Sequence, residues 1–240
     1  MHSIIIKIAG VNLLIEYKYS QTRFFLEEFS TKDFPQYRIA ITNERLQNEQ
    51  AILIHKFPQK KFSVCEIERN VLYRDIPKIL FKEKVIVFHG VLICYLNKGY
   101  IFTAPSGMGK STHADLWKKK FGDKVCIING DKPLLKLTES GVIAYGSPWK
   151  GKENIGNNRS VKLNGICFLE RSDKNFAQNI EMNAEVLTWL LNQTQIYGLE
   201  HFLHERMKWL IDMSKYIYLY KLWCNVSDDA VSVAHKIMTS

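Results

Sequence analysis

The sequence predicts an α/β protein in two parts, a small α+β unit over residues 1–84 and a larger α/β domain over residues 85–240. Short apolar runs of strand length alternate along the chain with stretches of helical periodicity, which is the pattern of a mixed α/β fold. From Val85 onward the composition becomes richer in strand-forming residues. A length of 240 residues with 46% apolar residues is enough for one domain and a smaller companion.

The first part contains three apolar runs of strand length and one long helical pattern. The strands expected there are Ile4–Ile8, Val11–Tyr17 and Tyr37–Thr42. Glu66–Lys82 repeats apolar residues with a helical period, and we expect Pro77 to interrupt that helix. This part carries no chemical motif, so we expect it to serve as a scaffold or in substrate recognition.

The second part alternates strands with amphipathic helices. The strands expected there are Val85–Phe88, Val91–Leu96, Tyr100–Phe102, Val125–Ile128, Leu134–Leu137, Val142–Tyr145, Ile166–Leu169 and Tyr216–Leu222. The helices expected there start near Lys110, at Met182 (to Asn192), at Leu199 (to Met213) and after the capping residue Ser227.

The stretch from Ala104 to Ser111 has the spacing of a phosphate-binding loop, with Ala in place of the usual first Gly. Gly107 and Gly109 permit backbone angles that turn successive N–H groups toward an anion. Lys110 supplies a positive charge for the outer phosphates, and the Ser111 hydroxyl suits Mg²⁺. The helix that begins near Lys110 points its positive end at the same anion.

The competing interpretation of this stretch is an ordinary glycine turn between a strand and a helix. The apolar strand before the loop and the helix after it favour a nucleotide site instead.

Asp131 ends an apolar strand about 20 residues after this loop, where a carboxylate commonly lies beside the metal and the γ-phosphate. We expect Asp131 to act as a general base or as a metal ligand, and the residues alone do not separate the two roles. Lys132 either keeps Asp131 ionised or contacts phosphate, and the competing interpretation is a solvated lysine.

Three sets of histidines are candidates for chemistry. His89 lies between two apolar strands, where a hydrogen-bonded structural role competes with assistance to proton transfer. We expect His113 to face outward from the first helical turn after the loop, close to the phosphates. His201 and His204 lie three residues apart near Glu205, but a third metal ligand is not evident, so a helix surface is favoured.

Residues 146–158 form a glycine-rich, charged loop. Lys150 and Lys152 are candidates to neutralise phosphate, and Glu153 is a candidate second metal ligand. The competing interpretation is a surface loop with scattered charges.

The composition limits the classes of partner and location. The net charge of +9 suits phosphate-bearing ligands, and nucleic acid is disfavoured because the lysines form neither a long basic tract nor an aromatic-interleaved pattern. No apolar run approaches the length of a membrane-spanning helix, and the N-terminus lacks the features of a signal peptide. The five cysteines are scattered without a CxxC pair, which predicts reduced thiols and a cytoplasmic protein.

The chain resembles the catalytic core of HPr kinase/phosphorylase in the order of three features, which are His89-Gly90, the segment Ser106–Ser111 and Asp131. That enzyme shares its nucleotide fold with ATP-dependent phosphoenolpyruvate carboxykinase. The chain is most similar to the small HPr-kinase-like proteins, some of which phosphorylate peptides, such as lasso-peptide precursor kinases. The strings that carry this resemblance are APSGMGKSTHADLW, INGDKP and GSPWKGKEN. The resemblance covers residues 60–170 at the level of motifs.

The resemblance implies a P-loop kinase core on a mixed sheet, with Mg-ATP as the phosphoryl donor and a serine hydroxyl as the acceptor. It implies catalytic roles for Asp131, Lys110 and His89, and Mg²⁺ ligation by Ser111 and Asp131, to which the charged loop adds Glu153 as a candidate ligand. The nucleotide-binding residues that it implies are Ser106, Gly107, Met108, Gly109, Lys110, Ser111 and Thr112, and the charged loop adds Lys150 and Lys152 as candidates.

The chain departs from that family in two respects. The HPr enzymes have adjacent aspartates where this chain has Gly130-Asp131-Lys132, which puts the reverse phosphorylase reaction in doubt. A clear equivalent of the family's glycine-rich C-terminal signature is also missing, so HPr itself is disfavoured as the substrate.

The predicted function is therefore an ATP-dependent kinase that transfers the γ-phosphoryl group to a hydroxyl, with a serine of a peptide or small protein as the favoured acceptor. A peptide, a carrier protein and a small hydroxylated metabolite all stay open as acceptors, and homo-oligomerisation stays open as well. The alternative is a nucleotide-binding regulatory protein with little or no transferase activity. A weaker alternative is phosphoenolpyruvate-type decarboxylation, which requires a second metal site that the sequence does not place.

Overall fold

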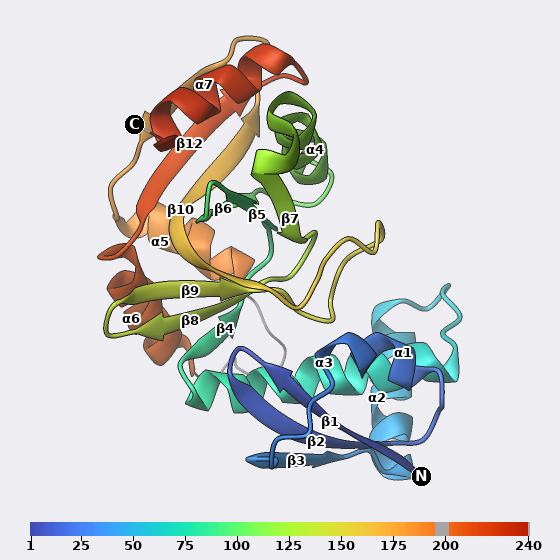
Figure 1. The fold of residues 1–240 in the computed structure, drawn as a ribbon. Helices are drawn as coiled ribbons and strands as arrows, with labels where there is room; N and C mark the ends of the chain where they lie inside the picture. The colour runs from blue at the N-terminus through green and yellow to red at the C-terminus, as the bar shows by residue number, and fades with distance from the viewer. Residues whose placement is uncertain (195–201, 240) are drawn as a thin grey trace. The chain divides into compact units, whose positions relative to one another are not determined.

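A computed structural model describes residues 1–194 and 202–239 of the chain. Within these residues the chain divides into two compact units, residues 1–83 and residues 84–194 with 202–239. Each unit has its own sheet, and we describe them separately (Figure 1).

The N-terminal unit contains a three-stranded sheet in the order β1-β2-β3, from β1 (His2–Ile8), β2 (Val11–Tyr17) and β3 (Tyr37–Ala40). β1 and β2 are antiparallel, and β2 and β3 are parallel. Alternate residues of β2 are buried, as expected for a sheet with one covered face. The three strands predicted for this unit are therefore present.

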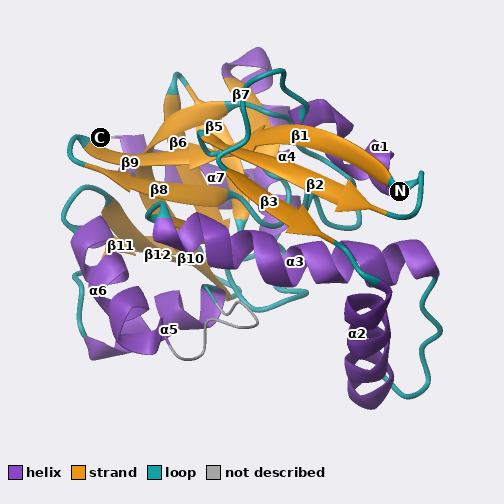
Figure 2. Ribbon diagram, turned by 90° about the horizontal axis from the view of Figure 1, so that it is seen from below, coloured by secondary structure: helices purple, strands orange, loops and turns teal. Residues whose placement is uncertain are grey.

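The helices of this unit are α1 (Thr22–Leu26), α2 (Asn43–Lys56) and α3 (Val64–Lys82), which Figure 2 shows beside the sheet. α3 begins at a capping box, in which Ser63 and Glu66 satisfy each other's backbone N–H groups. The predicted interruption at Pro77 is wrong, because α3 continues through it with Ile76, Pro77 and Leu80 all buried. Packing of that apolar face outweighs the loss of one helical hydrogen bond at the proline.

The larger unit is built on a nine-stranded mixed sheet with the path β4-β8-β9-β10-β6-β5-β7, to which β12 and β11 are added beside β10. This is the mixed sheet expected from the sequence. The strand bounds are β4 (Val85–Val87), β5 (Val91–Tyr95), β6 (Lys98–Thr103), β7 (Val125–Asn129), β8 (Leu134–Thr138), β9 (Gly141–Tyr145), β10 (Ser160–Arg171), β11 (Phe176–Asn179) and β12 (Tyr218–Cys224).

β10 holds the sheet together because three strands pair with it. Its first residues pair antiparallel with β9, and its later residues pair parallel with β6 on one side and with β12 on the other. Gly165 of β10 allows a close approach, since a Cβ there would lie 2.6 Å from the Tyr220 ring. The sequence predicted only Ile166–Leu169 of this strand, because the apolar run marks its buried centre alone.

The described helices of this unit are α4 (Lys110–Phe121), α5 (Ala184–Gln193), α6 (Leu203–Ser214) and α7 (Asp228–Thr239). α6 corresponds to the predicted helix Leu199–Met213, of which Leu199 and His201 lie outside the described residues. In residues 1–194 and 202–239, no helix is long and apolar enough to cross a membrane.

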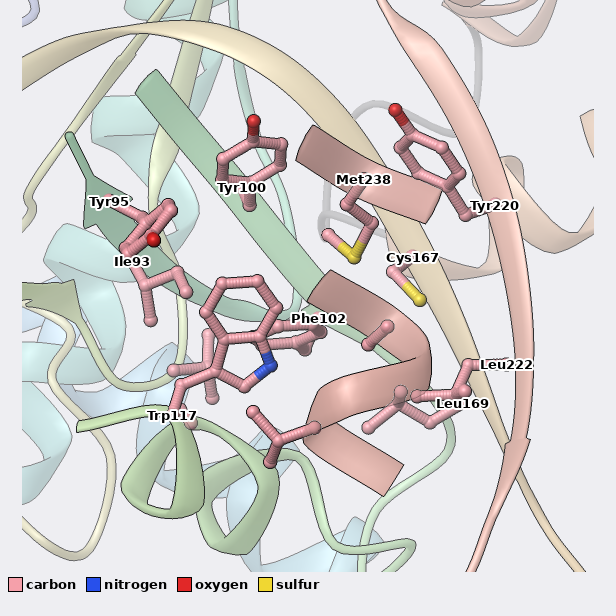
Figure 3. Close-up of a cluster of buried hydrophobic side chains, with 14 of the residues drawn as sticks. Ile93, Tyr95, Tyr100, Phe102, Trp117, Cys167, Leu169, Tyr220, Leu222 and Met238 are labelled. Carbon is pink, nitrogen blue, oxygen red and sulfur yellow. The ribbon is translucent and has the colours of Figure 1, made fainter. Parts of the chain in front are cut away.

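One hydrophobic cluster fills the space between the sheet, α4 and α7 (Figure 3). Trp117 of α4 is fully buried there and packs against the rings of Tyr95, Phe102 and Phe121. On the other side of Met238, Figure 3 shows Cys167, Leu169, Tyr220 and Leu222. This cluster fixes the position of α4 against β5 and β6.

Trp117→Ala removes the largest fully buried side chain of this cluster. We expect the free energy of unfolding to fall by about 3 to 5 kcal/mol, because apolar burial is lost and a cavity is left. Urea unfolding followed by circular dichroism measures this loss. Val226→Ala, at a position that is 74% exposed, is the control and should change the free energy by less than about 0.5 kcal/mol.

Candidate functional site

The loop between β6 and α4 is shaped by two glycines in the left-handed region. Gly107 has φ of 80°, and Gly109, the residue before the first turn of α4, has φ of 96°. A Cβ at either position would meet no atom within 4 Å, so these glycines are required by backbone angle and not by crowding. No side chain caps α4, which leaves its first-turn N–H groups for another acceptor.

Lys110 folds back over this loop. Its Nζ donates hydrogen bonds to the carbonyl oxygens of Ala104 at 3.0 Å and of Pro105 at 3.3 Å. Burial lowers the pKa of Lys110, the carboxylate of Asp131 opposes that shift, and Lys132 adds to it. The Lys110 ammonium therefore lies at the loop and within the electrostatic reach of Asp131.

Asp131 follows β7 in a turn that the side chain of Asn129 stabilises. Asn129 Oδ1 accepts hydrogen bonds from the backbone N–H groups of Asp131 at 3.0 Å and of Lys132 at 2.7 Å. This is an Asx-type turn, and it sets the direction in which the Asp131 carboxylate points.

Asn129 is itself held by Ser147, and both side chains are completely buried. Asn129 Nδ2 donates to the carbonyl oxygen and to Oγ of Ser147, each at 3.2 Å. Ser147 Oγ in turn donates to the Lys132 carbonyl oxygen at 2.6 Å. These bonds join the Asp131 turn to the start of the loop 146–158, so the two segments form one hydrogen-bonded unit.

Two positively charged or ionisable groups lie beside the Asp131 carboxylate. Lys132 Nζ forms an ion pair with Oδ2, and His89 Nε2 lies 3.6 Å from Oδ1. The backbone of Gly90 also donates to the Asp131 carbonyl oxygen at 2.9 Å. Asp131 is thus bound to the β4–β5 connection through both its backbone and its side chain.

His89 is positioned from two directions. Its backbone N–H donates to the Gln193 carbonyl oxygen at 2.8 Å, and its Nδ1 lies 3.1 Å from Gln193 Oε1. Thr103 Oγ1 donates to the His89 carbonyl oxygen at 2.8 Å. Burial lowers the pKa of His89, Lys110 and Lys132 add to that shift, and Asp131 opposes it. These contacts direct His89 Nε2 toward Asp131.

The loop 146–158 is anchored at its base and exposed at its tip. The backbone N–H of Gly130 donates to the Ile155 carbonyl oxygen at 2.9 Å, and the backbone N–H of Asn157 donates to the Ile128 carbonyl oxygen at 3.0 Å. Residues 151–154 are exposed. Gly151 has φ of 77°, and a Cβ there would lie 2.9 Å from Asp131 Cβ and 3.6 Å from Glu153 Oε2. The loop therefore brings Glu153 close to Asp131.

These segments surround a cavity of about 430 Å³. The residues that line it come from four separate parts of the chain. They include Asp131 and Glu153, the two carboxylates expected from the sequence. The residues that line it are His89, Ser106, Gly107, Gly109, Lys110, Ser111, Thr112, Gly130, Asp131, Gly151, Lys152 and Glu153. Met108 and Lys150 do not line it, so the structure does not bring these two together with the rest.

A second cavity of about 560 Å³ lies on the other side of the loop and shares Gly107, Gly109 and Thr112 with the first. Met108 lines this second cavity, together with residues from the ends of β10 and β12. Arg171, at the end of β10, donates from Nη2 to the Gly107 carbonyl oxygen at 2.6 Å. The loop therefore separates the two cavities, and Arg171, which lines the second one, holds the loop through this hydrogen bond.

Ser111, Asp131 and Glu153 supply only oxygen ligands at the first cavity. One hydroxyl and two carboxylates suit Mg²⁺, which usually keeps several waters and binds phosphate oxygens as well as protein ligands. Among the described residues there is no cluster of three or more His, Cys, Asp and Glu that could bind a metal on its own.

The outward orientation predicted for His113 is wrong. His113 is buried, its Nε2 accepts a hydrogen bond from Trp117 Nε1 at 3.1 Å, and its ring packs edge-on against Phe102 at 4.6 Å. A buried indole N–H needs an acceptor, and His113 provides it. His204 is exposed on α6, while its neighbour His201 lies outside the described residues.

Four residues of the site were missed from the sequence. Asn129, which directly precedes Gly130-Asp131, has a local signal, because Asn at a strand end favours a turn of this kind. Ser147, Gln193 and Arg171 have none, since each acts on a residue far away in the chain.

A scan against protein-family models finds no match for this chain, and a search of curated proteins finds none either. Among solved structures, the chain is similar to the Hpr(Ser) kinase/phosphatase from Coxiella burnetii, with a TM-score of 0.37 and 9% sequence identity. The similarity covers 64% of this chain and 96% of that chain. At this TM-score the relationship is distant and establishes neither the P-loop details nor the activity of this chain.

His113 should make the stability of the larger unit depend on pH. Burial lowers its pKa to about 4, against an ordinary value of 6.5. As the pH falls below 6.5 the unfolded chain takes up the proton first, so this contribution is complete above that pH and is lost progressively toward pH 4. The loss from His113 is roughly 3 kcal/mol.

The measurement is the urea midpoint at several pH values between 7 and 4. His113→Gln, which keeps an acceptor for Trp117, is the matched variant and should lose less stability than the wild type over this range. Equal losses in the two proteins would show that His113 is not the group responsible.

Proposed function

We propose that this protein is an ATP-dependent phosphotransferase that moves the γ-phosphoryl group to a hydroxyl, with a serine of a peptide or small protein as the expected acceptor. A single observation carries the proposal. One cavity at the N-terminus of α4 is lined by Lys110, Ser111, Asp131, Lys152 and Glu153. Such a set offers phosphate binding, metal ligation and a base within one site.

The loop residues fit the phosphates of a nucleotide. The left-handed Gly107 and Gly109 leave open space where a Cβ would stand, and the N–H groups of the first turn of α4 have no side-chain cap. An anion at a helix N-terminus is stabilised by those N–H groups and by the helix dipole. Lys110 would exchange the carbonyl oxygens of Ala104 and Pro105 for phosphate oxygens, which bind a cation more strongly.

Ser111 would hold Mg²⁺ through its hydroxyl, and Asp131 and Glu153 through their carboxylates. The bound metal would offset negative charge on the phosphate oxygens during transfer. Lys152, at the exposed tip of the loop 146–158, would add a further positive charge over the phosphates. The anchors at the base of that loop, the buried Ser147 and the backbone bond from Gly130 to Ile155, would leave its exposed tip free to close over the site.

Asp131 would steer or accept the proton of the acceptor hydroxyl. Its direction is set by the Asn129 turn, and Lys132 forms an ion pair with its carboxylate. His89, at 3.6 Å from Asp131 and held by Gln193, would orient that carboxylate. The second cavity lies directly across the loop, and it would receive the nucleoside end of the donor, with Met108 in its lining.

The alternative is a nucleotide-binding regulatory protein with little or no transfer activity. The Lys132 ion pair favours it, because that contact occupies one oxygen of the Asp131 carboxylate. Binding of phosphates by the loop does not depend on that oxygen.

Lys110→Ala and Asp131→Asn test the assignment. We expect each to lower phosphoryl transfer from Mg-ATP by about 100-fold or more, because a transition-state charge or a proton acceptor is removed. Transfer is measured with isotope-labelled ATP and a library of serine- and threonine-containing peptides, by mass. Lys118→Ala and Asp123→Asn change exposed residues that do not line the cavity, and they should keep full activity.

Calorimetry with Mg-ATP separates the two functions. We expect Asp131→Asn to bind the nucleotide and Lys110→Ala to bind it weakly. Binding by the wild type without transfer to any peptide would favour the regulatory protein. Transfer at the wild-type rate by either site variant would contradict the assigned roles.

A further inference from the structure

Two cysteines lie directly opposite each other on neighbouring strands. Cys94 is on β5, Cys126 is on β7, and the antiparallel register of these strands pairs the two residues. Side chains of directly opposed residues leave the sheet on the same face. The two thiols are therefore neighbours, although 31 residues lie between them in the chain.

This thiol pair is on the face of the sheet that does not belong to the hydrophobic cluster. The adjacent residues Ile93, Tyr95 and Val125 belong to that cluster, and neighbouring positions on a strand face opposite sides. Both Cys94 and Cys126 are partly exposed, so a small reagent can reach them.

The spacing of opposed residues suits a disulfide. Their Cα atoms are about 4.5 to 5.5 Å apart in antiparallel sheets, and disulfides span about 4.4 to 6.8 Å between Cα atoms. Their Cβ atoms, at about 4.5 to 5.5 Å, must approach slightly to reach the separation of a relaxed disulfide. A bond formed under this constraint is more easily reduced than a relaxed one.

Arg159 provides a positive charge at the pair. Its Nη1 lies 3.6 Å from Cys126 Sγ, and it acts on Cys94 as well. A guanidinium beside a sulfur stabilises the thiolate, which is the form that attacks a disulfide. Because Arg159 contacts the Cys126 sulfur directly, we take Cys126 as the attacking thiol.

The other cysteines lack this arrangement. Cys167 is 1% exposed, and burial raises its pKa. Burial also raises the pKa of Cys224. Cys65 belongs to the N-terminal unit, in which it is the sole cysteine.

We propose that Cys94 and Cys126 form a reversible thiol-modification site, which closes to a disulfide by exchange with a low-molecular-weight disulfide such as oxidised glutathione. The Cys126 thiolate attacks one sulfur of the reagent and expels the first small thiolate. The Cys94 thiolate then attacks Cys126 in the mixed disulfide and expels the second. Two protein thiols are oxidised, the reagent is reduced to two small thiols, and the two protons pass to the released thiolates.

Formation of the Cys94–Cys126 disulfide would affect the base of the loop 146–158. Cys126 Sγ accepts contacts from Arg159 and from Asn157 Nδ2, the latter at 3.9 Å. The backbones of the same two residues also hold the loop. The N–H of Asn157 donates to the Ile128 carbonyl oxygen, and the Arg159 carbonyl oxygen accepts from the N–H of Gly146. Displacement of the Cys126 sulfur toward Cys94 would weaken these side-chain contacts, so we expect amide exchange in residues 146–158 to become faster.

The test uses the reduced, full-length protein incubated with oxidised glutathione. Free thiols are then alkylated with N-ethylmaleimide under denaturing conditions, and the digest is analysed by mass spectrometry. We expect linked peptides that contain Cys94 and Cys126, with the remaining cysteines alkylated. Dithiothreitol should reverse the linkage and restore the original amide exchange of residues 146–158.

Matched variants make the result specific. Cys94→Ser should leave Cys126 as a glutathione adduct, and Cys224→Ser should keep the Cys94–Cys126 linkage. Arg159→Gln should slow closure several-fold, whereas Arg159→Lys, which keeps the charge, should slow it less. If folded wild-type protein gives no Cys94–Cys126 linkage, or links these residues no more often than other cysteine pairs, the proposal is wrong.

Discussion

The packing of α4 against β5 and β6 is the interaction on which the candidate site depends. Trp117 and Ala114 are fully buried on the inner side of that helix, and Phe102 of β6 packs against Trp117. The end of β6 and the start of α4 are thereby held at fixed positions. The residues between them must turn within a few positions, which only left-handed glycines allow easily. A rigid hydrophobic cluster thus supports a loop whose backbone N–H groups stay available to a ligand.

Charges around the cavity are arranged in a way that favours an anion. Among the described residues that line the cavity, Lys110 and Lys152 stand beside the carboxylates Asp131 and Glu153, and Lys132 forms an ion pair with Asp131. Burial lowers the pKa of Lys110, which means that its charged form lacks full compensation from its surroundings. A phosphate group would supply that compensation. The same positive excess is visible in the whole chain, with a net charge of +9.

β7 connects the two chemical features of the larger unit. Its last residue, Asn129, directs Asp131 toward the cavity, and Cys126 near its start faces Cys94. The loop 146–158 contacts β7 at both places, through Ser147 at Asn129 and through the Asn157 side chain at Cys126. A change at the thiol pair can therefore reach the loop that carries Lys152 and Glu153 through direct contacts and without a long chain of couplings.

The sequence by itself determined the features that depend on neighbouring residues. The strand, the glycine loop and the helix around Lys110 follow from an apolar run, two glycines and a helical period, and each of these acts over a few residues. The candidate set of Lys110, Ser111 and Asp131 was accessible for the same reason, and the cavity brings these residues together. Their chemical roles stay predictions.

Only the tertiary structure decided the long-range pairings. Helix α3 continues through Pro77 because its apolar face is buried, and His113 turns inward because that side of α4 packs against Phe102 of β6. The contact of Cys94 with Cys126 follows from strand order and register. The contacts of His89 with Gln193 and of Asn129 with Ser147 join residues at the ends of elements that are far apart in the chain. β5 and β7 are not joined by a hairpin turn, so their register depends on how the buried faces of the whole sheet pack, which the pattern of either strand alone does not fix.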